Sequence, residues 1–110
     1  MTTTGPSYVA ELADGKITEF EVTAADAGLP TATAAELKGG DPEANAAALR
    51  DLLDGKPGAY RDIVLYNAAA SLIVAGKAAD LKAGVKLATT SIDDGHARAA
   101  LDKLVAITNI

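Results

Sequence analysis

The sequence predicts an α+β chain in which an N-terminal β-hairpin is followed by short turns and about four helices. Residues 7–22 are rich in β-forming side chains and are interrupted once, by an Asp-Gly pair. After residue 41, helix-capping residues and helix-ending glycines recur, and 25 of the 110 residues are alanine, the strongest helix former. A chain of this length suits one domain at most.

The hairpin is expected to turn at Asp14-Gly15, a dipeptide that favours a two-residue type I′ turn because both positions tolerate positive φ. Its strands are expected at about residues 7–13 and 16–22, with three glutamates on the solvent side: Glu11, Glu19 and Glu21. A two-stranded hairpin is marginally stable in water. It is therefore expected to lie on helices of this chain or to join a larger sheet that the chain does not contain.

Two short turns are predicted after the hairpin. The first begins at Thr23, has Asp26 at the capping-box position and ends at Gly28. The second begins at Thr33, has Glu36 at the same position and ends at a Gly-Gly pair.

A helical part is predicted over residues 41–108. Asp41 is a good N-cap, Pro42 suits the first helical position and Gly55 suits the position after the end, which predicts a helix over about residues 42–54. Its expected apolar face is Ala46, Leu49, Leu52 and Leu53.

Three more helices are predicted. Residues 60–75 are apolar nearly all round, which predicts a central, buried helix. Asp80 is expected to cap the next, whose apolar stripe is Leu81, Val85, Ala88 and Ile92. Gly95 separates it from the last, whose predicted apolar face is Ala97, Ala100, Leu101, Leu104 and Val105.

Composition excludes several classes of function. A net charge of -5 disfavours nucleic-acid binding, and the absence of cysteine with a single histidine excludes cysteine nucleophiles and multi-histidine metal sites. No leader segment is visible, which predicts a cytoplasmic location. The longest apolar stretch, residues 63–76, falls short of the roughly 20 residues that cross a bilayer, so no membrane association is expected.

The core is expected to be thin. No tryptophan, one phenylalanine and three tyrosines leave mainly leucine, isoleucine and valine to fill it. A free-standing chain of this size buries roughly two thirds of its unfolded surface. We therefore expect the chain to need a neighbour.

The run Gly39-Gly40-Asp41-Pro42 precedes a helix N-terminus, where backbone N–H groups bind anions in some proteins. Asp41 is expected to place its own carboxylate there, and no Walker or GxGxxG spacing is present. We interpret the run as a capped turn.

Asp93 and Asp94 are adjacent on a predicted helix, so their side chains point in different directions, and we expect a solvated helix end there. His96 is expected to be exposed. No partner lies at a spacing that would make it a general base.

Polar residues on the predicted helices are the remaining candidates. Asn67 and Ser71 lie four residues apart and are expected to share a buried face, where Asn67 either ties the helix to a loop backbone or lines a substrate cleft. Asn45 allows the same two interpretations. The hydroxyl-rich run 2–5, taken alone, predicts a frayed terminus. The residues therefore indicate no catalytic, cofactor-binding or metal-binding side chain.

Several segments, in order, resemble a known family. They are Thr2-Thr3-Thr4-Gly5-Pro6, Val9-Ala10-Glu11-Leu12, Asp14-Gly15-Lys16-Ile17, Phe20, Gly28-Leu29-Pro30, Leu37-Lys38-Gly39-Gly40-Asp41-Pro42-Glu43-Ala44-Asn45-Ala46, Arg61-Asp62-Ile63-Val64-Leu65-Tyr66-Asn67-Ala68-Ala69-Ala70, Ala75-Gly76-Lys77-Ala78 and Ile92-Asp93-Asp94-Gly95. Together they resemble the C-terminal third of anthranilate phosphoribosyltransferase.

The resemblance implies a magnesium-using enzyme that transfers the phosphoribosyl group of phosphoribosyl pyrophosphate to anthranilate in tryptophan biosynthesis. It also implies that residues 1–110 are one C-terminal segment, an α+β fragment of an α/β domain, with the hairpin in a larger sheet and the later helices around it. The family's Gly-rich pyrophosphate loop, its Lys-His-Gly-Asn segment, its anthranilate-contacting arginine and its magnesium-binding acidic pair all precede the matched region. No catalytic, cofactor or metal residue is therefore carried over, and the chain is expected to bind no magnesium itself.

Our leading hypothesis is a C-terminal part of this transferase that is inactive alone. Two alternatives stay open: a non-catalytic helical interaction module on the same scaffold, and a related superfamily transferase segment with another acceptor. The open hairpin edge predicts self-association or association with the upstream part of the enzyme.

Overall fold

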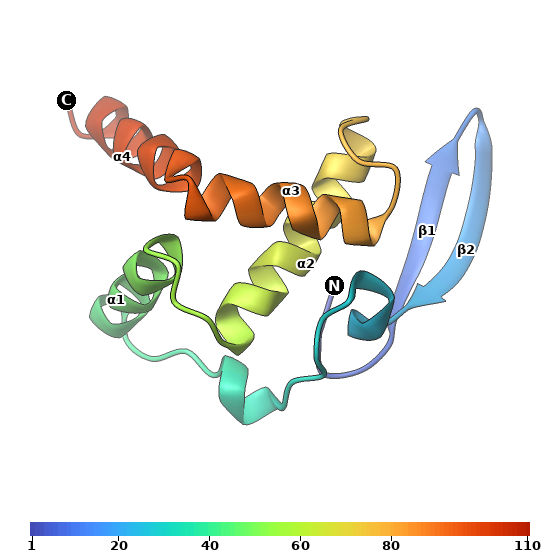
Figure 1. Ribbon diagram of the computed structural model, residues 1–110, viewed down its shortest axis with the longest axis horizontal. Coiled ribbons are helices and arrows are strands. Elements are labelled where there is room, and N and C mark those ends of the chain that lie inside the picture. Colours follow the sequence, from blue (N-terminus) through green and yellow to red (C-terminus); the bar gives the residue numbers. More distant parts are fainter.

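The computed structural model describes residues 1–110 and has the predicted α+β composition (Figure 1). Strands β1 (Ser7–Ala13) and β2 (Lys16–Val22) form the hairpin, and two 3₁₀ turns, η1 (Ala24–Ala27) and η2 (Ala34–Leu37), follow it. Four helices complete the chain: α1 (Pro42–Leu53), α2 (Ala59–Val74), α3 (Leu81–Asp93) and α4 (His96–Thr108). No helix is both long and apolar enough to cross a bilayer.

The hairpin has the predicted turn and register. Asp14 and Gly15 have φ values of 53° and 75°, and Tyr8 pairs with Glu21 across the antiparallel strands. All three glutamates are exposed, although the register places Glu11 on the opposite face from Glu19 and Glu21. The hairpin projects from one edge of the molecule, and the helices of this chain do not pack around it (Figure 1). Of the two expected arrangements, packing on this chain's own helices is therefore not the one observed.

The predicted caps are present at the starts of two helices and of both 3₁₀ turns. The Asp41 and Asp80 carboxylates each accept a hydrogen bond at 2.8 Å from the backbone N–H three residues later, at the starts of α1 and α3. At η1 and η2, the Asp26 and Glu36 carboxylates accept from the backbone N–H of Thr23 and Thr33.

The principal core lies where α1, α2 and α3 meet. Leu52, Leu65, Ala88 and Ile92 form its buried cluster. The α2 and α3 helices make the most extensive helix contact because Gly84 has no side chain; a Cβ there would lie 2.7 Å from the Cα of Ala69. The α1 face and the α3 stripe thus pack as predicted.

Other predicted faces are not covered. Leu104 and Val105 of α4 are 58% and 51% exposed, so the expected apolar face of α4 is largely bare. Asn67 and Ser71 are exposed rather than buried, although the Asn67 side chain contacts the Met1 backbone. The α2 helix is central, as expected, but it is only partly enclosed.

The N-terminal run is also different from the expectation of a frayed end. Thr3 is 1% exposed, and its carbonyl accepts a hydrogen bond from the Ala32 backbone N–H at 2.9 Å. Local sequence could not show this contact, because the partners lie far along the chain. Residues 1–4 are therefore an ordered part of the fold.

The molecule exposes more surface than a free-standing chain of its size. Its accessible area is 7368 Å², whereas size scaling for folded monomers gives about 5,700 Å². The radius of gyration is 15.1 Å, compared with about 13 Å for a compact domain. The expected thin core is thus observed as a surplus of exposed, partly apolar surface.

Candidate functional site

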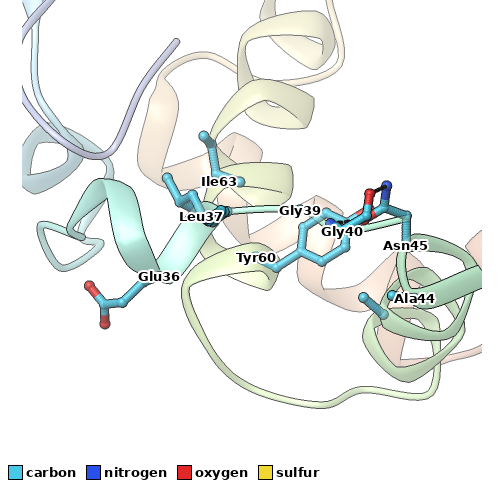
Figure 2. Close-up of a pocket in the computed structure, with 10 residues that line it drawn as sticks. Glu36, Leu37, Gly39, Gly40, Ala44, Asn45, Tyr60 and Ile63 are labelled. Carbon is cyan, nitrogen blue, oxygen red and sulfur yellow. Dashed lines mark hydrogen bonds between the residues drawn. The ribbon is translucent and has the colours of Figure 1, made fainter. Parts of the chain in front are cut away.

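One cavity, of about 460 Å³, lies at the Gly-Gly run that the sequence singles out. It is lined by η2, the loop that follows, the start of α1 and the start of α2. Figure 2 shows the Tyr60 ring and the Asn45 side chain on either side of the Gly39–Gly40 backbone, with Glu36 pointing away. This cavity is the strongest candidate for a ligand site because its walls combine apolar and polar groups.

The Asn45 amide, one of the polar groups that line this cavity, is already engaged. Asn45 Oδ1 accepts a hydrogen bond from the Gly40 N–H at 2.9 Å, and Asn45 Nδ2 donates to the Gly40 carbonyl at 3.0 Å (Figure 2). A Cβ on Gly39 would lie 3.0 Å from Asn45 Oδ1, so the Asn45 amide would have to shift if Gly39 carried a side chain. These bonds support the structural interpretation of Asn45, in which its side chain ties the helix to a loop backbone.

Acidic groups beside the cavity are likewise used as caps. The Asp41 carboxylate bonds the Ala44 N–H, so an incoming anion would meet a negative charge at the N-terminus of α1. The Thr33 backbone N–H, and then the Thr33 hydroxyl, lowers the pKa of Glu36. The Gly39-Gly40-Asp41-Pro42 run is thus a capped turn, as predicted, and not a phosphate loop.

Asp93 and Asp94, the acidic pair at the end of α3, differ in their contacts. Arg61 of α2 forms two hydrogen bonds with the Asp93 carboxylate, at 2.9 and 3.1 Å, whereas Asp94 and His96 are exposed. Burial raises the pKa of the neighbouring Asp62, and the Arg61 charge offsets part of the shift. The Arg61–Asp93 pair was not predicted, since no local signal links residues 32 positions apart.

Asn67 is a structural amide, as one of its two interpretations held. Its Nδ2 donates to the Met1 carbonyl at 2.8 Å and to the Ile63 carbonyl at 3.0 Å. Ser71 donates to the Asn67 carbonyl at 3.3 Å. Neither side chain lines the cavity at Gly39–Gly40.

The largest hollow is an apolar groove of about 700 Å³ between the four helices. Leu53, Leu72 and Leu87 contribute to its mainly aliphatic wall, and its polar residues are Ser71, Lys77 and Ser91. It contains no carboxylate, histidine or amide that could act as an acid, a base or a substrate anchor. Its chemistry suits the burial of an apolar protein surface rather than catalysis.

A sequence model described as "Glycosyl transferase family, a/b domain" matches residues 1–98. The chain belongs to this family. It is 66% identical over 109 residues to an anthranilate phosphoribosyltransferase of Parvibaculum lavamentivorans, and 60% identical over 109 residues to one of Rhodopseudomonas palustris strain BisA53. Each match covers 99% of this chain and 32% of the relative.

Structural comparison agrees with this assignment. The crystal structure of anthranilate phosphoribosyltransferase from Thermus thermophilus matches with a TM-score of 0.86 at 37% identity, over 97% of this chain and 32% of that chain. The chain therefore spans about a third of the length of the relatives that it matches.

The side chains of this chain do not fit a magnesium site. Magnesium is held by oxygen ligands, chiefly carboxylates. No group of three or more potential metal ligands comes together, and Asp93 is paired with Arg61.

Proposed function

We propose that this chain is the C-terminal third of a cytoplasmic anthranilate phosphoribosyltransferase of tryptophan biosynthesis, and that it supplies scaffold rather than reacting groups. The whole enzyme would transfer phosphoribosyl from phosphoribosyl pyrophosphate to anthranilate, with magnesium and substrates held by the other two thirds. The observation that carries the proposal is 66% identity over 99% of this chain to a relative of which it covers 32%. The same identity leaves the interaction-module alternative without a supporting observation.

The exposed surface supports the same proposal. The surplus of about 1,700 Å² over a compact monomer is of the order that one side of a large obligate interface buries. Much of it is apolar, in the helical groove, on α4 and along the hairpin. We propose that the upstream part of the enzyme covers these faces and that the hairpin joins its sheet.

An assay of the purified chain tests the catalytic half of the proposal. Stabilising the departure of pyrophosphate needs several oriented charges around the leaving group, and Lys38 is the only cation that lines the Gly39–Gly40 cavity. With anthranilate, phosphoribosyl pyrophosphate and magnesium, we expect no loss of anthranilate fluorescence. Metal-dependent consumption of anthranilate that persists when Asp93 and Asp94 are replaced would contradict the proposal that this chain supplies no reacting groups.

A binding experiment tests the scaffold half. The upstream two thirds of the Parvibaculum lavamentivorans enzyme is titrated into this chain by calorimetry, and Leu87→Glu is compared with Lys86→Glu. Leu87 is 44% exposed in the groove, whereas Lys86 is exposed and does not line it. Leu87→Glu should weaken binding about tenfold or more, because a charge would be buried in an apolar interface. Equal binding of the two variants would exclude the groove as the contact.

A further inference from the structure

The Asn67 side chain holds the backbone at Met1 by two-way hydrogen bonding. The Met1 amino group donates to Asn67 Oδ1, and Asn67 Nδ2 donates to the Met1 carbonyl at 2.8 Å. The same Nδ2 donates to the Ile63 carbonyl one turn earlier on α2, which fixes the amide on its own helix. Because the contact is to backbone atoms, it determines the position and direction of the chain whatever side chain stands there.

Thr2 and Thr3, which follow Met1, make further contacts with the rest of the chain. Thr3 is one of ten buried residues in the whole chain, and its carbonyl accepts a hydrogen bond from the Ala32 backbone N–H. The Thr2 N–H donates to Ser7 Oγ at 2.9 Å. The N-terminus therefore lies near the middle of the molecule, whereas the C-terminus lies at its outer edge (Figure 1).

We infer that Asn67 is a positioning residue for the polypeptide that enters the fold at Met1. This inference rests on the proposed function, in which the upstream two thirds of the enzyme, with the substrate-binding groups, precede Met1. In the whole enzyme, the peptide N–H of residue 1 would replace the amino group as the donor to Asn67 Oδ1. The Asn67 amide thus fixes the path of the preceding chain against α2, and catalytic geometry depends on such support to within about half an ångström.

Asn45 provides a matched control. It makes the same two-way pair with the Gly40 backbone, five residues away, and it is exposed like Asn67. Loss of either amide removes a two-way side-chain contact to one residue's backbone. Only Asn67 links the N-terminal segment to a helix 66 positions later.

The first experiment uses this chain itself. Amide hydrogen exchange at residues 2–4 is compared in wild type, Asn67→Leu, Asn67→Asp and Asn45→Leu. The Asp variant retains an acceptor but loses the donor to Met1 and Ile63. Asn67→Leu should accelerate exchange at residues 2–4 by about tenfold or more while the middle of α2 stays protected, and Asn45→Leu should not. Asn67→Asp should accelerate it less, because its carboxylate still pairs with the Met1 amino group. Unchanged exchange in Asn67→Leu would overturn the inference.

The second experiment uses a joined enzyme, in which the upstream two thirds of the Parvibaculum lavamentivorans enzyme precede this chain. Asn67→Leu should lower kcat by about tenfold to a hundredfold. Its melting temperature should stay close to that of Asn45→Leu. A kcat of Asn67→Leu equal to that of the wild type would overturn the positioning role. An inactive wild-type joined enzyme would instead contradict the proposed function, and the exchange experiment would still decide whether Asn67 holds the segment.

Discussion

Arg61 and Asp93 join the start of α2 to the end of α3 by two near-parallel hydrogen bonds of 2.9 and 3.1 Å. The Arg61 side chain is only 12% exposed, whereas that of Asp93 is 49% exposed. Two-point pairing of arginine with a carboxylate constrains both position and angle. The pair therefore closes one end of the α2–α3 packing, which gives Asp93 a structural role.

Replacement of Arg61 by methionine should lower the free energy of unfolding by about 1 kcal/mol, because a half-exposed bidentate pair is worth more than a typical surface pair. The exposed Lys56–Asp51 pair, at 3.5 Å, is the control, and Lys56→Met should have almost no effect. A double-mutant cycle with Asp93→Asn isolates the coupling. Coupling energies that are the same for both pairs would contradict this prediction.

Gly84→Ala should destabilise the chain by about 2 kcal/mol, since overpacking outweighs the gain in helix propensity. The new Cβ would meet backbone and side-chain atoms of Ala69 at 2.7 to 2.9 Å, so α2 and α3 must move apart. Gly5→Ala is the control because nothing lies within 4 Å of its Cβ position. Urea denaturation measures both, and a neutral Gly84→Ala would show that the two helices are not closely packed.

Tyr66 should make the chain less stable at alkaline pH. Burial, followed by the negative charge of Asp26, raises its pKa above the ordinary value of 10.0, and the nearby Ser7 hydroxyl offsets part of the shift. Ionisation is therefore easier in the unfolded chain, so stability falls as pH rises above about 10. Tyr66→Phe should remove this part of the loss, as measured by denaturation from about pH 8 to about pH 11. The substitution should cost little at neutral pH, because the buried hydroxyl makes no well-formed hydrogen bond. An identical alkaline decline in both proteins would contradict the assignment to Tyr66.

The bare hairpin should cause the isolated chain to self-associate. Tyr8, Leu12 and Ile17 share one face of the hairpin and are 80%, 72% and 69% exposed. Unpaired strand edges and apolar faces promote further pairing. Sedimentation velocity should show association that Ile17→Lys reduces and that Thr18→Lys, on the opposite face, leaves unchanged. A wild-type chain that is monomeric at high concentration would contradict this expectation.

The local elements were predictable because their signals are local. Asp14-Gly15 specifies the hairpin turn, and Asp41 and Asp80 specify helix starts through contacts within three residues. The Gly39-Gly40 run was correctly interpreted as a capped turn for the same reason. These features need no information about what surrounds the chain.

Contacts between distant residues, and the surfaces left bare, were not predictable in this way. The apolar residues of α2 and α4 led us to expect that the Asn67 side of α2 and the apolar face of α4 are buried. Both are exposed in this chain. The apolar face of α4 suits a partner that this chain does not provide. The order of residues 1–4 depends on Asn67 and Ala32, which local reasoning could not connect with them. Of the candidate site, only the capped turn at Gly39–Gly40 was predictable, because the cavity walls also come from the start of α2, which is distant in the sequence.

The central claim is that this chain is the scaffold third of a transferase whose reacting groups lie upstream. The most direct test measures anthranilate consumption by the upstream two thirds of the Parvibaculum lavamentivorans enzyme, with phosphoribosyl pyrophosphate and magnesium, as this chain is added. We predict negligible activity from either part alone and a saturable, magnesium-dependent rate from the mixture. A mixture that forms a stable complex but remains inactive, or an upstream part that is fully active without this chain, would contradict the account.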